Sequence, residues 1–311
     1  MAAVANALLP VFLIIAFGVV LKRTLLPADE AWLGLERLTY FVLFPALLIV
    51  TTATADLKDL PAGGVAAALF LAVIILSAAL FAARVPLTRA LALSGPAYSS
   101  MFQGATRWNT YVALAIASAL YGTSGLALVS VAIVAMVPIL NVINVWIIAH
   151  YAADERPGLQ TVVGHMLRNP FIWSSLAGIA INFAGLPLPK AIVVFGEILG
   201  RASLALGLLL VGAGLVLGDV LRPDARVYVT AVLKLLIMPA IAIGIGLALG
   251  LSGEALSVVA IAASVPSAPS GYVLARQLGG DAPLLARILT FETLLALATI
   301  PLALALAALR P

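Results

Sequence analysis

Apolar side chains make up 64% of this 311-residue chain, whereas charged residues make up only 10%. Soluble domains carry roughly 25% charged residues, so the composition excludes a soluble globular protein and indicates an integral membrane protein. The absence of cysteine excludes disulfides, thiolate metal sites and a cysteine nucleophile. The formal charge of +4 follows membrane topology, as described below, and does not indicate a nucleic-acid partner.

Ten apolar stretches are long enough to cross the roughly 30 Å hydrocarbon core of a bilayer as helices. Short connections join them, and glycine or proline marks most of these turns. We therefore predict an all-α polytopic membrane protein with ten transmembrane helices. In chain order the predicted spans are residues 4–21, 35–54, 62–83, 97–121, 125–150, 169–186, 191–217, 227–249, 254–278 and 283–309.

The distribution of lysine and arginine predicts the orientation of these spans. If the N-terminus lies outside, the connections after the odd-numbered spans and their flanks hold eleven of the 17 basic residues. Three lie on the opposite side and three within spans. Cytoplasmic loops of membrane proteins carry such an excess of positive charge, so both termini are expected on the non-cytoplasmic side.

The fourth and ninth predicted spans are interrupted, by polar residues within 101–111 and by prolines within 264–272. Broken helices at membrane depth persist only where they are buried in protein or line a cavity. Two interrupted spans at corresponding positions of two halves indicate the binding site of a transporter.

Five spans in each half would place the second half in the membrane upside down relative to the first. The predicted domains are a first five-helix repeat at 1–150 and a second, inverted repeat at 167–311. A cytoplasmic loop at 151–166 is expected to connect them. The fourth and ninth spans then occupy equivalent positions as broken crossover helices.

Arg107 is the first candidate for substrate binding in the first break. An arginine near the centre of a span costs about 2.5–3.5 kcal/mol on insertion scales, so it should face a cavity or a partner. Its guanidinium offers a fixed fork of donors that suits a carboxylate. The alternatives are a structural ion pair or a side chain that reaches the membrane surface. Asn109 and Tyr111 add polar groups for a ligand, although Asn109 could instead satisfy backbone groups freed at the break.

In the second break, Pro266 and Pro269 remove two backbone donors and free earlier carbonyls. Ser264, Ser267 and Ser270 recur at every third residue and are expected to face one cavity. Helix N-termini exposed at such a break carry partial positive charge, which favours an anion. The alternative is a plain kink that the serine hydroxyls repair.

Other polar residues lie inside predicted spans. Lys234 and Glu292 have no local partner, so they could contact each other across helices or titrate during transport as coupling or gating residues. Asn141 is a further candidate, either as a hydrogen bond between helices or as a sodium ligand. Glu197 and Arg201 lie one helical turn apart, which predicts a local salt bridge.

Several segments resemble one known family. They are Leu-Arg-Asn-Pro-Phe at 167–171, the stretch 182–189, the stretch 234–239, the stretch 266–281 and Arg-Trp-Asn-Thr at 107–110. In these segments the chain resembles the auxin efflux carrier family, in particular its bacterial members, and the resemblance covers nearly the whole chain. One departure is Ala113-Leu114-Ala115, where the family often has glycine and proline.

The resemblance implies a ten-helix inverted-repeat fold like that of the bile-acid sodium symporters. Spans 4 and 9 would cross at mid-membrane, and a scaffold and a transport domain would move past one another. It also implies transport of small organic anions, such as dicarboxylates or auxin-like weak acids. The expected location is a bacterial inner membrane.

We therefore expect a secondary transporter of mono- or dicarboxylates, such as malonate or malate, or of auxin-like weak acids. Alternating access at the crossover of spans 4 and 9 would move the anion. No phosphate-binding loop is present, and neither a cofactor nor a metal site is expected, with coupling to H⁺ or Na⁺ left open. The expected partners are the anion, the bilayer and, as an open option, a second copy of the chain.

The alternatives to a carrier are an anion channel, a membrane receptor and, least favoured, an intramembrane enzyme. Hydrolytic or transfer chemistry would need a serine–histidine pair, paired aspartates or a histidine cluster inside the membrane. The predicted span centres hold none of these arrangements, so we do not expect an enzyme.

Overall fold

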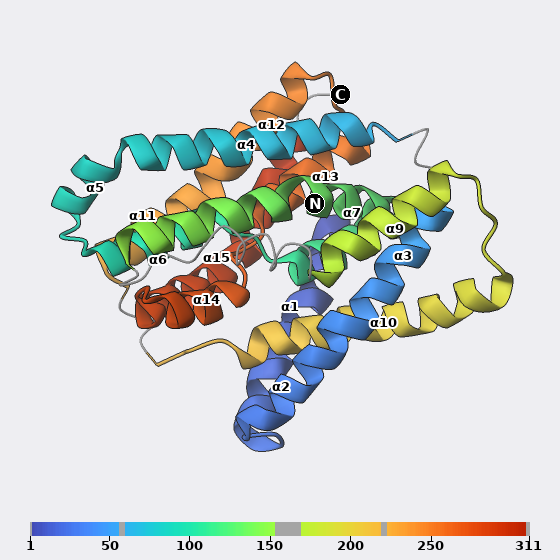
Figure 1. The fold of residues 1–311 in the computed structure, drawn as a ribbon, viewed down its shortest axis with the longest axis horizontal. Helices are drawn as coiled ribbons and strands as arrows, with labels where there is room; N and C mark the ends of the chain where they lie inside the picture. Colours follow the sequence, from blue (N-terminus) through green and yellow to red (C-terminus); the bar gives the residue numbers. More distant parts are fainter. Residues whose placement is uncertain (1, 56–59, 153–168, 219–222, 309–311) are drawn as a thin grey trace.

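The computed structural model describes residues 2–55, 60–152, 169–218 and 223–308, and this part of the chain is helical without strands (Figure 1). The helices of the first half are α1 (Ala2–Thr24), α2 (Asp29–Leu38), the π-turn η1 (Thr39–Leu43), α3 (Phe44–Thr54), α4 (Ala62–Ala82), α5 (Arg84–Ala90), α6 (Gly95–Thr106) and α7 (Thr110–Tyr151). Those of the second half are α9 (Pro170–Phe183), α10 (Lys190–Ala213), α11 (Ala225–Val232), the π-turn η2 (Leu233–Ile237), α12 (Met238–Ala248), α13 (Gly253–Ser264), α14 (Ser270–Leu278) and α15 (Ala282–Ala308).

Seven helical segments of the described chain are long and apolar enough to cross a membrane, which supports the predicted polytopic all-α class. Two further apolar helices, α9 and α13, are shorter. The short helix α5, in the connection after the third predicted span, was not predicted. Most of the predicted loop 151–166 lies outside the described residues.

The second part of the fourth predicted span and the fifth predicted span meet at Gly122. This residue has φ 58° and ψ −132° inside the range assigned to α7. Only glycine adopts such a positive φ at little cost, so Gly122 lets the chain reverse where the sequence predicted a turn.

Two helices contain a π-turn directly before a proline. The Phe44 N–H donates to the Thr39 carbonyl and the Met238 N–H to the Leu233 carbonyl, five residues earlier in each case. Pro45 and Pro239 follow. A proline has no N–H, and its ring clashes with the carbonyl four residues before it, so a widened turn relieves the clash.

The helices pack in two groups. The first helix group consists of α1, α2, η1, α3, α9 and α10, in which α3 packs on α9 and α10, and α1 on α10. The second helix group consists of α4, α6, α7 and α11–α15, with α13 enclosed by α4, α7, α12 and α15. In Figure 1 the first group lies towards the right and bottom, α4 runs across the top, and α6, α11 and α14 lie towards the left. Nine of the twelve residues of α13 are buried, which agrees with its position between the other helices of the second group.

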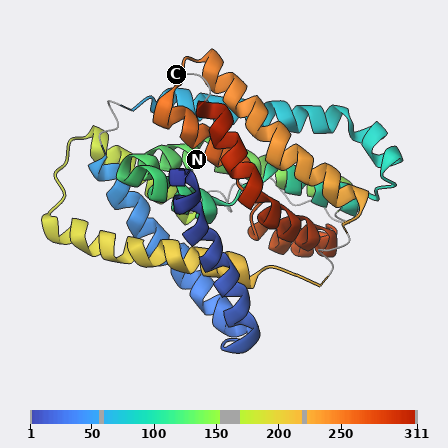
Figure 2. The ribbon, with the colours of Figure 1, turned by 180° about the vertical axis from the view of Figure 1, so that it is seen from behind.

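Within the first group, α1 and α10 cross in close backbone contact (Figure 2). A Cβ atom added to Gly212 would lie 1.9 Å from the Ile15 carbonyl oxygen, and one added to Gly18 would lie 2.3 Å from the Leu209 carbonyl oxygen. Small residues at crossings let membrane helices approach closely and gain dispersion contacts. Any side chain at these two positions would therefore push the helices apart.

We expect Gly212→Ala to lower the thermal stability of the purified protein, because the added methyl group overpacks the α1–α10 contact at a cost of about 1–3 kcal/mol. The measurement is the unfolding temperature in detergent. Gly244→Ala on α12 is the matched control, since nothing lies within 4 Å of its added Cβ atom. Equal unfolding temperatures for the two variants would contradict the close packing of α1 on α10.

Asp224, directly before α11, joins α11 to α15. Its Oδ1 accepts hydrogen bonds from the N–H groups of Arg226 (3.0 Å) and Val227 (3.2 Å), and its Oδ2 accepts one from Arg287 Nη2 (3.0 Å). Partial burial raises the pKa of Asp224, but the hydrogen bonds from Arg226, Val227 and Arg287 outweigh it and lower the pKa to about 2.

Because its pKa is lowered by folding, Asp224 stabilises the fold fully above the ordinary pKa of about 3.9 and loses this effect as the pH falls towards 2. We expect Asp224→Asn, which retains the helix cap but not the charge, to unfold at a lower temperature than wild type at pH 5–7. This gap should close between about pH 4 and pH 2. A gap that stays constant over this pH range would show that the carboxylate charge has no role.

Candidate functional site

The two helix breaks meet directly. Residues 107–109 separate α6 from α7, and residues 265–269 separate α13 from α14. The backbone N–H of Asn109 in the first break donates to the carbonyl of Pro266 in the second, at 2.8 Å. The breaks therefore lie where the sequence predicted them, and each satisfies a backbone group of the other.

Local chemistry explains both breaks. The Asn109 side chain caps α7, because its Oδ1 accepts from the N–H groups of Tyr111 (3.1 Å) and Val112 (3.3 Å). In the second break, Pro266 and Pro269 cannot donate the hydrogen bonds that would continue α13. Asparagine at an N-cap stabilises a helix start by about 1 kcal/mol, so the first restart is encoded locally.

A cavity of about 610 Å³ lies beside the meeting point. Both helix groups form its walls: α2, η1 and α9 on one side, and the two breaks, α7 and α14 on the other. The lining residues are Leu33, Glu36, Arg37, Tyr40, Phe41, Arg107, Trp108, Asn109, Thr110, Tyr111, Val137, Leu140, Asn141, Val145, Asn169, Phe171, Ala268, Pro269, Ser270, Val273, Leu274 and Gln277.

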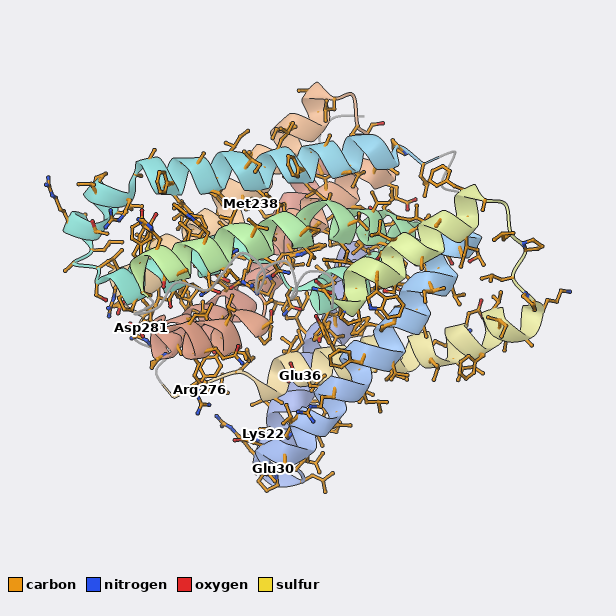
Figure 3. The ribbon with its side chains drawn as sticks, in the orientation of Figure 1. Lys22, Glu30, Glu36, Met238, Arg276 and Asp281 are labelled. Carbon is orange, nitrogen blue, oxygen red and sulfur yellow. The ribbon has the colours of Figure 1, made fainter. Side chains whose placement is uncertain are left out.

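The cavity extends from the breaks towards one end of the helices. It reaches Arg37 on α2, Asn169 at the start of α9 and Gln277 near the end of α14. These residues adjoin the connections after the first, fifth and ninth predicted spans, which with their flanks hold seven of the 17 basic residues. In Figure 3, Lys22 and Glu30 are labelled near the α1–α2 turn, and Arg276 and Asp281 near the end of α14.

Arg107 is buried, with 8% of its surface exposed, and lines the cavity. Its Nη1 donates to Ser270 Oγ and its Nη2 to Asn141 Oδ1, both at 3.1 Å, while Nε has no partner among the described residues. The three ion pairs in the described part of the chain, at Asp29 and Asp224, do not involve Arg107. The hydrogen-bond partners of the Arg107 guanidinium are thus neutral, and no described carboxylate lies within 4 Å to balance its positive charge.

Several helix N-termini lie around the cavity. The helices α7, α9 and α14 all begin beside it, and the N-terminus of a helix carries partial positive charge. Asn169 caps α9 as Asn109 caps α7, because its Oδ1 accepts from the Phe171 N–H at 3.0 Å. Two buried donors, Trp108 Nε1 and Asn109 Nδ2, have no partner among the described residues. These two nitrogens are themselves shielded from the cavity, so the partial charges of the helix starts and the Arg107 guanidinium are what would favour an anion here.

Aromatic rings line the cavity beside the polar end. Tyr111 stacks on Phe44, with ring centroids 4.8 Å apart and planes 2° from parallel. Phe171 lies 5.2 Å from Phe44 and 5.2 Å from Tyr40. Tyr40 and Phe44 belong to the first helix group and Tyr111 to the second, so this aromatic cluster also joins the two groups.

The three serines of the second break do not share one cavity, so that prediction is wrong. Only Ser270 lines the cavity and contacts Arg107. Ser264 Oγ donates to the Ile261 carbonyl in its own helix, and Ser267 contacts Glu292. Because α13 ends at Ser264, the three-residue spacing no longer places these hydroxyls on one face.

Pro269 lines the cavity, whereas Pro266 contributes its carbonyl to Asn109. Asn141 lies in the cavity and binds Arg107, and Tyr111 forms part of the wall. The structure therefore brings together Arg107, Asn109, Tyr111, Asn141, Pro269 and Ser270, and leaves Ser264, Pro266 and Ser267 behind the cavity wall.

Lys234 and Glu292 are both fully buried but form no ion pair within 4 Å and do not line the cavity. Lys234 Nζ donates to the Ala263 carbonyl at 3.4 Å, and Glu292 Oε2 accepts from the Ser267 N–H at 2.9 Å. The predicted salt bridge between Glu197 and Arg201 is absent, and both residues are exposed on α10.

Tyr40, Phe41, Asn169 and Phe171 also line the cavity, although no role was predicted for them. A usable signal was present for two of them. Asn-Thr-Tyr at 109–111 and Asn-Pro-Phe at 169–171 share an asparagine cap followed two residues later by an aromatic ring. Both rings reach the same cavity.

The comparison with known proteins gives two findings. The membrane transport protein family, which includes auxin efflux carrier-like proteins, matches residues 3–304 of the chain. An uncharacterized transporter of the archaeon Methanothermobacter thermautotrophicus is 33% identical over 135 residues, which is 43% of this chain. The match spans 44% of that relative's length.

Because the family match extends over almost the whole chain, it includes both helix breaks and every described residue of the cavity. The chain belongs to the auxin efflux carrier-like family of membrane transport proteins.

Proposed function

We propose that this protein is a secondary carrier that moves small organic anions across the membrane by alternating access at the two helix breaks. The observation that supports this most strongly is Arg107, a buried guanidinium that faces a cavity and has only neutral hydrogen-bond partners among the described residues. An unbalanced charge at membrane depth costs a few kcal/mol on insertion scales, and a bound anion would offset this cost.

The donor-rich end of the cavity favours a carboxylate. The guanidinium holds its donors in a planar fork that matches the two oxygens of a carboxylate. The first turns of α7 and α14 add partial positive charge from two sides. An anion that replaced Asn141 or Ser270 as partner of Arg107 would gain a charge-assisted hydrogen bond.

The walls favour a monocarboxylate with a flat apolar body. Arg107 is the cation at the polar end, and rings of Tyr40, Tyr111 and Phe171 lie beside it. A dicarboxylate such as malonate or malate is the second candidate, because Arg37 also lines the cavity and offers a second cation. Glu36 lines the cavity next to Arg37 and would weaken its attraction for a second carboxylate.

We further propose that the chain crosses the membrane ten times as two inverted five-helix repeats, with α6–α7 and α13–α14 as equivalent crossovers. In a bacterial inner membrane both termini would lie on the non-cytoplasmic side. The first helix group would act as the scaffold and the second as the transport domain. The packing of the described helices in two groups, with the cavity between them, supports this division.

The decisive experiment is counterflow in proteoliposomes that contain wild type or Arg107→Ala. Vesicles are loaded with unlabelled anion, and uptake of labelled phenylacetate or malonate is followed. We expect saturable exchange by wild type and at least a tenfold loss in Arg107→Ala, since the charge that binds the carboxylate is removed. Arg201→Ala, at an exposed site on α10, is the control and should exchange like wild type.

Full exchange by Arg107→Ala would contradict the proposed role of this residue. Flux without saturation or counterflow would favour the anion channel. A receptor would bind the anion without any flux, and chemical conversion of the anion would indicate an enzyme.

A second prediction uses Asn141, which lies 3.1 Å from Arg107 Nη2. We expect Asn141→Asp to abolish anion exchange, because a carboxylate of nearly the same shape would pair with Arg107 and replace the substrate. Asn141→Ser removes the amide without adding charge and should retain at least a third of wild-type exchange. The measurement is again counterflow, with folding checked by size-exclusion chromatography. Equal activities of the two variants would contradict the argument.

A further inference from the structure

Glu292 on α15 is the one acidic side chain that is fully buried in the described part of the chain. The other acidic residues described, such as Glu36, Glu197 and Asp224, keep contact with the surroundings. Burial of a charged carboxylate at membrane depth is costly and requires partners. Its partners therefore indicate its role.

Those partners belong to the second helix break. Glu292 Oε2 accepts hydrogen bonds from both the N–H and the O–H of Ser267, whereas Oε1 has no partner among the described residues. Ser267 lies between Pro266 and Pro269, where the chain leaves the helical path. The carboxylate thus binds the break itself and does not contact the cavity.

Lys234 makes a further hydrogen bond to the chain next to the second break. Its Nζ donates to the carbonyl of Ala263, which lies four residues before Ser267. In a continuous helix the Ser267 N–H would donate to this same carbonyl. Lys234 and Glu292 therefore divide one missing helical hydrogen bond between them: the lysine satisfies the acceptor and the glutamate satisfies the donor.

Two hydrogen bonds connect the second break to residues that line the cavity. The Pro266 carbonyl, next to Ser267, accepts from the Asn109 N–H of the first break. Three residues after Ser267, Ser270 Oγ accepts from Arg107 Nη1. The position of Ser267 therefore determines where the break places Ser270 against the guanidinium.

We propose that Glu292 is a positioning residue of the anion site, which holds the second break open through Ser267 so that Ser270 stays against Arg107. This proposal rests on the proposed function, because the site it positions is the proposed anion site. Glu292 does not contact the anion. It acts through the backbone and hydroxyl of one residue.

The test compares Glu292→Ala, Glu292→Gln and Ser264→Ala in the counterflow assay, with labelled phenylacetate as the probe. Glu292→Ala should raise the KM of exchange about tenfold or more and leave the maximal rate within about threefold, because anion binding is weakened while the exchange step is retained. Glu292→Gln retains a carbonyl acceptor for Ser267, so its KM should stay within about threefold of wild type.

Ser264→Ala is the matched control, since Ser264 is equally buried but its hydroxyl bonds only within α13. Hydrogen–deuterium exchange of peptides that contain residues 265–272 gives a second readout. Exchange there should rise in Glu292→Ala and match wild type in Glu292→Gln and Ser264→Ala.

An unchanged KM and unchanged hydrogen exchange in Glu292→Ala would overturn the proposal. So would a Glu292→Gln variant as impaired as Glu292→Ala, because the carboxylate charge and not the acceptor would then be required. If wild type exchanges no anion, the proposed function fails. The hydrogen-exchange comparison then still decides whether Glu292 holds the break.

Discussion

Every backbone group freed at a helix break inside a membrane must find a partner within the protein, and this constraint shapes the centre of the molecule. The second break frees an N–H at Ser267 and carbonyls at Ala263 and Pro266. These groups bind Glu292, Lys234 and the N–H of Asn109 in turn. Two buried ionisable side chains and the backbone of the first break thus satisfy groups of the second break that a regular helix would have satisfied itself.

The same constraint explains why Arg107 remains available for a ligand. Glu292, the fully buried acidic side chain of the described residues, is bound to the second break and does not line the cavity. Arg107 is left with the hydroxyl of Ser270 and the amide of Asn141, which orient it without balancing its charge. A neutral partner gives a weaker hydrogen bond than an anion does, so a carboxylate competes favourably for the guanidinium.

The sequence predicted the positions of the breaks because their signals are local: an asparagine that can cap α7, and two prolines that cannot continue α13. It misplaced Ser264 and Ser267 because a three-residue period assumes a helix that ends, in fact, at Ser264. The predicted salt bridge between Glu197 and Arg201 does not form, because two exposed charges one helical turn apart gain little from pairing. Tyr40 and Phe171 lie more than a hundred residues apart in the chain, and only the packing of α9 beside η1 brings their rings together.

The two helix groups contribute different kinds of residue to the cavity, and this difference suits the proposed transport cycle. The polar groups at the head of the cavity, Arg107, Asn141 and Ser270, all belong to the second group. The first group contributes mainly aromatic walls there, through Tyr40 and Phe171. Aromatic and apolar contacts are non-directional, so they can slide and re-form at little cost compared with a hydrogen bond to a charge. An anion held by the second group alone could therefore move with it past the first group and keep its charge-assisted hydrogen bonds throughout.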